Sequence, residues 1–315
     1  MSELKRIATR QSYGEALAEL GETDDRIVVL DADLAESTKT AIFGKKFPDR
    51  FIDCGIAEAN MVSMAAGLAT CGKIPFCSSF AMFATGRAYE QIRNSVGYPH
   101  LNVRIAASHA GISVGEDGAT HQCIEDVSLM RNIPGMTVLC PADDVETKAC
   151  IKAVMDVDGP CYIRLGRLAV PAYNDADNYE FNLYEAPILR EGDDVTLFAT
   201  GLEVIETLQA ADKLSEEGIE AQVVNVHTIK PLDVDTVVSC AKKTGKVVTI
   251  EEHSIIGGLG SAVAEALSEN YPTKQLRIGI KDRFGESGPA LKLLEKYELD
   301  AAGIYKQVKE FLALI

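Results

Sequence analysis

Short apolar runs alternate with segments of helical spacing along the whole chain, and this alternation constrains the fold more than any other feature. The runs expected to form strands are residues 27–34, 103–108, 136–141 and 161–166, then 194–201, 220–228 and 246–253. Helices are expected near residues 10–20, 58–71, 85–97, 124–132 and 143–156, then near 203–217, 233–243, 260–269 and 301–314. Strand, helix and strand in succession indicate an α/β protein with mostly parallel sheets covered by helices on both faces.

A polar segment rich in Asn and Asp, "VPAYNDADNYEFNLYEA", separates two such halves. A chain of 315 residues is long enough for two domains. We therefore expect a first domain over residues 1–172, a linker over 173–189 and a second α/β domain over 190–315.

Charge, cysteine content and hydropathy argue against several classes of protein. The formal net charge of −16 disfavours nucleic-acid binding, which requires a cationic surface. None of the eight cysteines belongs to a CxxC pair, so they are expected to be reduced core residues and not disulfides or zinc ligands. No apolar run approaches the ~18 residues of a membrane span, and "MSELKRIATR" does not resemble a secretory signal. A cytoplasmic location is expected.

The densest group of polar residues is "SHAGISVGEDGATHQ", residues 108–122, which directly follows a predicted strand. Its glycines allow the backbone to adopt positive φ and to approach a ligand closely. His109 and His121 flank it, and histidine is the side chain best suited to proton transfer near neutral pH. A ligand site after a parallel strand is one interpretation, and a glycine-rich surface turn with incidental histidines is the other.

A single carboxylate, Glu58, precedes the apolar helical stripe in "FIDCGIAEANMVSMAAGLATCG". It suits either a functional group or a helix N-terminal charge favoured by the helix dipole. Phe80 and Phe83, three residues apart, suit either a pocket wall or plain core packing.

Arginines and aspartates near predicted strand ends are further candidates. Arg167 follows a strand, and its planar guanidinium suits phosphate recognition. Arg10 suits either phosphate recognition or a solvated surface charge. Arg164 suits either a ligand contact or a salt bridge within the sheet. Asp31 and Asp33 suit either a helix cap or a ligand hydroxyl.

Taken together, several motifs resemble the C-terminal portion of transketolase: "GIAEANM", "FCSSFAMF", "SHAGISVGEDGATHQ", "RNIPGMTVLCPAD" and "YIRLGR". "TIKPLD" and "EEHSIIGGLGSAV" extend the resemblance over essentially the whole chain. It implies a pyrimidine-binding domain followed by a transketolase C-terminal domain. The family's metal-and-diphosphate signature, a Gly-Asp-Gly followed by paired asparagines, has no counterpart in the sequence. The resemblance therefore implies the C-terminal subunit of a split transketolase.

The same resemblance implies a role for each candidate residue. Glu58 matches the glutamate that meets N1′ of the aminopyrimidine ring of thiamine diphosphate, and Phe80 and Phe83 match aromatics that stack on that ring. A third aromatic would fall near Gly86, and whether Tyr89 replaces it stays open. The residues that match contacts to the sugar are His109, Asp117 and Asp33 for hydroxyls, and Arg10, Ser37, His121 and Arg167 for the phosphate. Glu58 and His109 are the expected catalytic residues.

The implied activity is transfer of a two-carbon ketol unit from a ketose phosphate such as xylulose 5-phosphate to an aldose phosphate such as ribose 5-phosphate. A partner chain would carry the diphosphate-binding domain and bind Mg²⁺ or Ca²⁺, and an α2β2 assembly is expected. The alternatives are an enzyme for another ketose phosphate, the β-subunit of a 2-oxoacid dehydrogenase E1 component, and a non-catalytic subunit that kept the fold. The sugar-phosphate residues argue against the E1 subunit, and Glu58 with the loop histidines argues against the non-catalytic one.

Overall fold

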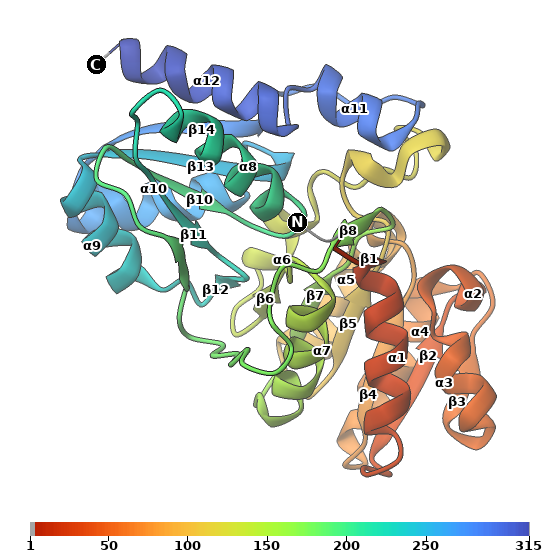
Figure 1. Ribbon diagram of the computed structural model, residues 1–315. Helices are drawn as coiled ribbons and strands as arrows, with labels where there is room; N and C mark the ends of the chain where they lie inside the picture. Colours follow the sequence, from red (N-terminus) through yellow and green to blue (C-terminus); the bar gives the residue numbers. More distant parts are fainter. Residues whose placement is uncertain (1–3, 315) are drawn as a thin grey trace.

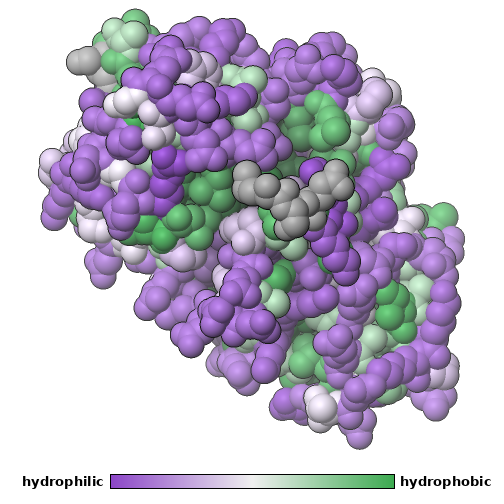
Figure 2. All heavy atoms as spheres, in the orientation of Figure 1, coloured by the Kyte–Doolittle hydropathy of each residue, from purple (hydrophilic) through white to green (hydrophobic). Residues whose placement is uncertain are grey.

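The computed structural model describes residues 4–314, which form two α/β units, each built on its own sheet (Figure 1). This confirms the predicted fold class. No helix within residues 4–314 is both long and apolar enough to cross a membrane. On the face shown in Figure 2, hydrophilic side chains predominate and hydrophobic ones form separate patches. All eight cysteines are free thiols, and six are buried as expected, but Cys71 is exposed and Cys54 is half-buried, so these two are not core residues.

The first sheet has seven strands in the order β12-β6-β7-β5-β4-β2-β3. In chain order they are β2 (Ile27–Asp31), β3 (Phe51–Asp53), β4 (Ile74–Ser78), β5 (Arg104–Ala107), β6 (Thr137–Leu139), β7 (Cys161–Arg164) and β12 (Thr228–Lys230). All neighbouring strands are parallel except β12, which pairs antiparallel with β6. The carboxyl ends of the parallel strands therefore lie along one edge, where ligand residues gather.

Helical segments cover both faces of this sheet. They are α1 (Thr9–Leu20), α2 (Ala35–Thr38), α3 (Ala41–Lys46), α4 (Glu58–Thr70), α5 (Tyr89–Gln91), α6 (Asp126–Arg131) and α7 (Asp144–Ala153), with the shorter or irregular turns η1 (Pro48–Arg50), η2 (Met82–Arg87), η3 (Ile92–Gly97), η4 (Ile112–Asp117) and η5 (Val154–Asp156). Alternate residues of β2 enter different cores, Val28 and Leu30 on one face and Ile27 and Val29 on the other. Period-two alternation in a strand buried on both faces produces this division.

The second sheet has the order β14-β13-β10-β11-β9. Its strands are β9 (Ile188–Arg190), β10 (Val195–Ala199), β11 (Ala221–Asn225), β13 (Lys246–Ser254) and β14 (Lys274–Ile280), and its helices are α8 (Glu203–Ser215), α9 (Val234–Thr244), α10 (Leu259–Asn270), α11 (Ala290–Lys296) and α12 (Ala301–Ala313). A two-stranded ribbon of β1 (Arg6–Ala8) and β8 (Ala169–Pro171) lies apart from both sheets. The limits predicted for the two domains and the linker stay predictions.

The sequence analysis did not predict β1, β3, β4, β8, β9, β12 or β14. Of these, β4 is central in the first sheet, and its Pro75 is unusual inside a central strand. The neighbouring N–H of Ile74 donates to Arg26 on the β2 side, so the Pro75 nitrogen faces the β5 side. Pairing with β5 begins only at Phe76. The missing N–H therefore removes no bond from the ladder.

The strand β12 comes from the second half of the chain and completes the first sheet. Thr228 pairs with Leu139 of β6. The ammonium of Lys230 donates to the carbonyls of Arg131, at 2.8 Å, and Ile133, at 2.6 Å. The two halves of the chain thus share a sheet as well as a packing surface.

Candidate functional site

Glu58 is the first residue of α4, and its side chain is only 1% exposed. A buried carboxylate requires a partner, because taking an unpaired charge out of water is costly. That partner is Arg87, whose Nη1 donates to both carboxylate oxygens at 2.9 Å. The Arg87 side chain is 53% exposed, so the pair lies at the boundary between core and solvent.

Arg87 is the last residue of the π-helical turn η2, which places its side chain beside Glu58. A π-turn accommodates one more residue than an α-helical turn and is frequent at functional sites, and Gly86 lies inside it. The guanidinium carbon of Arg87 lies 4.9 Å from the ring centroid of Phe83, within cation–π range. Tyr89 packs against the core on the α4 side of the sheet. A planar cation, and not a third aromatic ring, therefore lies between Phe83 and Glu58.

His109 stands at the start of the glycine loop, by which we mean residues 108–122. Its backbone has φ +58°, unusual for a residue other than glycine. Its ring stacks on Phe80 with centroids 3.7 Å apart. Arg10 Nη1 lies 3.2 Å from Nε2, and Ser108 Oγ lies 2.8 Å from Nδ1. Because arginine only donates, Nε2 accepts and the ring proton is assigned to Nδ1, which donates to Ser108.

The surroundings of His109 keep its ring neutral. Burial lowers the pKa of His109 to about 3. The nearby positive groups Arg10, Arg167 and His121 act in the same direction. At pH 7 this side chain is therefore an uncharged hydrogen-bonding group.

Positive charge gathers around the same loop. Arg10 Nη1 donates to the carbonyl of Ser37 at 2.7 Å. The pKa of Arg10 is lowered by burial and by the neighbouring charge of Arg167. Arg167 donates to the carbonyl of Val114 and pairs with Glu116 at 3.1 Å. Two guanidinium groups held near each other favour an anion between them.

The two loop histidines and the two phenylalanines form one aromatic group. The ring centroid of His121 lies 5.3 Å from that of Phe83 in an edge-on arrangement, and the rings of Phe80 and Phe83 stack at 5.9 Å. Thr120 Oγ1 lies 2.9 Å from His121 Nδ1. The predicted pocket wall is thus continuous with the charged group.

The structure therefore brings together most of the predicted site residues: Phe80, Phe83, His109, His121, Arg10, Ser37 and Arg167, with Glu58 joined to them through Arg87. Two others stand apart. Asp33 is exposed, and its N–H donates to Asp53 at 3.2 Å. Asp117 is exposed at the end of η4. Asp31 is buried and fixes the chain around α2, because its carboxylate accepts from Leu34 N and the hydroxyl of Thr38.

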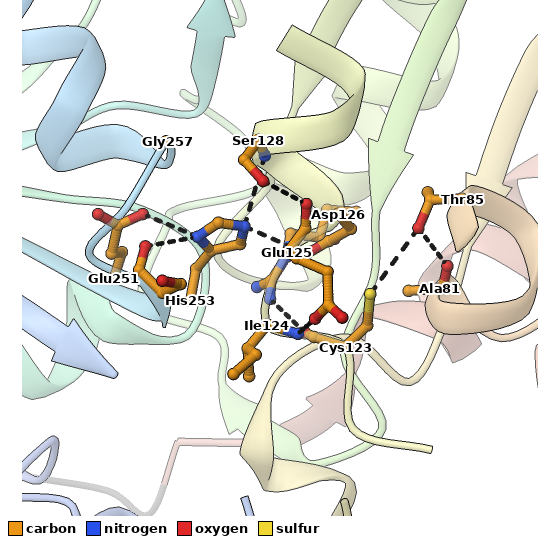
Figure 3. Close-up of polar contacts among 12 residues, drawn as sticks. Ala81, Thr85, Cys123, Ile124, Glu125, Asp126, Ser128, Glu251, His253 and Gly257 are labelled. Atoms are coloured by element: carbon orange, nitrogen blue, oxygen red, sulfur yellow. Dashed lines mark hydrogen bonds and ion pairs between the residues drawn. The ribbon is translucent and has the colours of Figure 1, made fainter. Parts of the chain in front are cut away.

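A buried polar network lies behind this site, where the two halves of the chain meet (Figure 3). The Asp126 carboxylate accepts from the Tyr162 hydroxyl at 2.6 Å and from Arg164 Nε at 2.8 Å. His253 Nε2 lies 3.8 Å from the other oxygen of Asp126, and its Nδ1 lies 3.6 Å from Glu251. Arg164 is thus a salt-bridged sheet residue and not a ligand candidate.

The glycine cluster that opens α10 is closed to anions. The Glu251 carboxylate accepts from Leu259 N at 2.7 Å and from Gly260 N at 2.8 Å. A protein carboxylate already occupies this helix N-terminus. Gly258 and Gly260 serve packing, since a Cβ at either position would overlap a neighbouring side chain.

Sequence reasoning missed Arg87, Ser108 and Asp126. Only Arg87 carried a signal, since it lies at the start of the helix expected near 85–97 and four residues after Phe83, a spacing at which helical side chains meet. Within residues 4–314 no group of three or more His, Cys, Asp or Glu is placed to hold a metal ion.

Comparison with known proteins gives the class of this architecture. The model of the transketolase pyrimidine-binding domain matches residues 5–172, and that of the transketolase C-terminal domain matches residues 184–304. A solved structure described as a split gene transketolase, inactive β4 tetramer, is 53% identical with a TM-score of 0.91, covering 98% of this chain and 99% of that chain. These matches define a two-domain protein with a pyrimidine-binding and a C-terminal domain.

Two relatives are similar over nearly their whole length. A putative transketolase C-terminal section of Methanocaldococcus jannaschii is 52% identical over 96% of this chain and 95% of its own length. A 6-deoxy-6-sulfo-D-fructose transketolase subunit of Clostridium sp. is 49% identical over 96% and 93%, respectively. The chain belongs to the transketolase family and corresponds to its pyrimidine-binding and C-terminal domains.

Proposed function

We propose that the chain is the C-terminal subunit of a two-chain, thiamine-diphosphate-dependent transketolase. It would transfer a two-carbon ketol unit from a ketose phosphate of the xylulose 5-phosphate type to an aldose phosphate of the ribose 5-phosphate type. The observation that carries the proposal is the buried carboxylate of Glu58, which faces a flat cation lying over Phe83.

The side chains present suit an aminopyrimidine. Arg87 offers Glu58 a planar, positively charged donor, and a protonated aminopyrimidine is another group of this kind. Arg87 is half exposed, so it can give up the position. When bound, thiamine diphosphate supplies the nucleophilic carbon for the ketose carbonyl. Glu58 would hold the proton at N1′, and Phe80 and Phe83 would fix the plane of the ring.

The charged group around the glycine loop would bind the sugar phosphate. Arg10 and Arg167, with Ser37 and His121, would hold the phosphate. Neutral His109 would orient a donor hydroxyl, because a pKa of about 3 makes it a weak proton acceptor near pH 7. Asp33 and Asp117 are exposed and would meet the sugar only in the assembled enzyme.

A partner chain would bind the diphosphate and the Mg²⁺ or Ca²⁺ ion, in a cytoplasmic α2β2 assembly. The printed names of the relatives support a divided enzyme, since they describe a C-terminal section, a subunit and a split gene. The similar tetramer described as inactive and composed of β-subunits supports the need for a second kind of chain.

A second candidate substrate is a ketose that carries a sulfonate. The relative from Clostridium sp. is named for 6-deoxy-6-sulfo-D-fructose. A sulfonate, like a phosphate, is a tetrahedral anion that guanidinium groups can bind. The same arginines would therefore serve either substrate.

The decisive experiment is a ketol-transfer assay of this chain alone and with proteins that co-purify from its native lysate. Thiamine diphosphate and Mg²⁺ would be present, with xylulose 5-phosphate or 6-deoxy-6-sulfo-D-fructose as donor and ribose 5-phosphate as acceptor. We expect activity only with the partner. Activity of the chain alone would contradict the two-chain enzyme, and activity with a 2-oxoacid but no sugar would favour an E1-type subunit.

A further inference from the structure

The second half of the chain contacts the glycine loop near both of its ends. A carboxylate oxygen of Glu252, on β13, accepts from the N–H of Ser113. The same carboxylate lies against Gly111, where an added Cβ would overlap it. Just past the loop, the N–H of Ser254 donates to the carbonyl of Ile124 at 2.8 Å. The strand β13 therefore fixes the loop near its start and just beyond its end.

A second contact comes from residues 284–289, which we call the clamp segment. Gln122 Nε2 donates to the carbonyl of Glu286 in this segment at 2.9 Å, and to the carbonyl of Ile112 in the loop at 3.1 Å. One side-chain amide thus joins the loop to the second half of the chain. The clamp segment is itself anchored, because the Tyr297 hydroxyl donates to the carbonyl of Phe284 at 2.9 Å.

Glycines on both sides permit this close approach. A Cβ at Gly285 would overlap Oε1 of Gln122, and a Cβ at Gly118 would overlap the hydroxyl of Ser287. At Gly115 a Cβ would lie 3.3 Å from the carbonyl oxygen of Gly288. A side chain at either of the first two positions would displace the amide of Gln122 or the hydroxyl of Ser287.

The loop needs such support because it has little regular structure of its own. Its one helical element, η4, is a short 3-10 turn with Gly115 at φ +85° inside it. Ordering a glycine-rich segment costs more entropy than ordering other residues. His109 and His121 lie near its two ends, so their positions depend on what holds the loop.

We infer that the C-terminal domain positions the substrate loop, with Gln122 as the positioning residue and the clamp segment as its support. The inference rests on the proposed function for the identity of the ligand that the loop binds. The contacts that hold the loop do not depend on that function. This inference gives the C-terminal domain a part in sugar binding through the loop that it holds. Because a displacement of about 1 Å can cost ~100-fold in rate, loosening the loop would impair catalysis without touching the cofactor residues.

The first test compares Gln122→Met with Gln275→Met by hydrogen–deuterium exchange on the full chain without ligands. Gln275 is a matched control, since its Nε2 also donates to a backbone carbonyl, that of Gly260 at 2.9 Å, but within the C-terminal domain. We expect Gln122→Met to speed exchange of the loop amides and to leave α4 unchanged, and Gln275→Met to leave the loop unchanged. This measurement needs no activity, so it can succeed or fail independently of the proposed function.

The second test measures kinetics of the assembled enzyme. We expect Gln122→Met to lower kcat/KM for the sugar phosphate by about 10- to 100-fold, while the Kd of thiamine diphosphate changes less than about twofold. If Gln122 only stabilised the fold, Gln122→Met would lower the Tm without lowering kcat/KM for the sugar phosphate selectively over cofactor binding. Tyr297→Phe, which removes only the anchor of the clamp segment, should show the same pattern with a smaller effect if Gln122→Met fails to fold. Unchanged loop exchange in either folded variant would overturn the inference.

Discussion

Arg87 Nη1 lies 2.9 Å from each carboxylate oxygen of Glu58, so one guanidinium nitrogen contacts both oxygens at the start of α4. Glu58 is buried and Arg87 is half exposed. The arginine can turn into solvent, whereas the glutamate is held in place. The carboxylate is therefore the fixed member of the pair and its partner is exchangeable.

Arg87→Met should destabilise the isolated chain by about 1–3 kcal/mol, because it leaves a buried carboxylate unpaired. The value lies below that of a fully buried pair, since solvent screens the exposed arginine. Urea denaturation would measure it. Arg93→Met is the control, because Arg93 is exposed and bonds Asn94 instead of a carboxylate. Equal effects of the two variants would show that the pair contributes nothing specific.

Glu58→Ala should abolish turnover of the assembled enzyme, with a loss of at least about 100-fold. The reason is the loss of the group proposed to hold the proton at N1′. Activity would be measured at saturating thiamine diphosphate. Glu36→Ala, which removes an exposed carboxylate paired with Lys45, should be nearly silent. Near-normal activity of Glu58→Ala with cofactor bound would exclude the role in cofactor activation.

Arg167→Met should raise the KM for phosphorylated sugars by about 10- to 100-fold, the effect of losing one hydrogen bond to a charged group. The KM for the unphosphorylated sugar should change little. Initial rates with both kinds of donor would test this. Arg26→Met, at an exposed pair with Asp24, is the matched control. Equal losses on the two donors would remove Arg167 from the phosphate site.

His109 should make the chain less stable as the pH falls. Its pKa is about 3 when folded, against an ordinary value of 6.5. Between these values the unfolded chain binds the additional proton, so the free energy of unfolding falls as the pH drops from about 6.5 toward 3. His109→Asn should reduce this slope in urea titrations at pH 7, 6 and 5.

His227→Asn provides the control for that experiment. Burial lowers the pKa of His227 to about 4, and its ring packs on Phe181 outside the candidate site. It should reduce the same slope but leave sugar kinetics unchanged. A wild-type slope that survives both substitutions would mean that neither histidine is responsible for the loss of stability.

The sequence predicts elements correctly where the spacing of apolar residues and the local chemistry indicate the same structure. The helix beginning at Glu58 and the strands around the glycine loop follow directly from apolar spacing, and the loop histidines follow from their place after a strand. The central strand β4 was missed, and Pro75 argues locally against a strand there. That pairing with β5 begins only at Phe76, after the proline, is a tertiary fact.

The contacts of the site could not be predicted from spacing. The meeting of Arg87 with Glu58 depends on a π-turn, which no apolar period reveals. The bond from Gln122 to the clamp segment joins residues 164 positions apart. Such pairings are set by how the two halves dock, so only the folded chain shows them.

The strand β12 lies in the second half of the chain but belongs to the first sheet, and this has a consequence for chimeras made from this chain. A first half swapped between relatives at the linker would lose the strand that covers β6 and would receive one shaped for another sheet. Exposed sheet edges invite pairing with other chains. Recombination should therefore transfer residues 228–230 together with the first half, so that β12 and β6 come from the same parent.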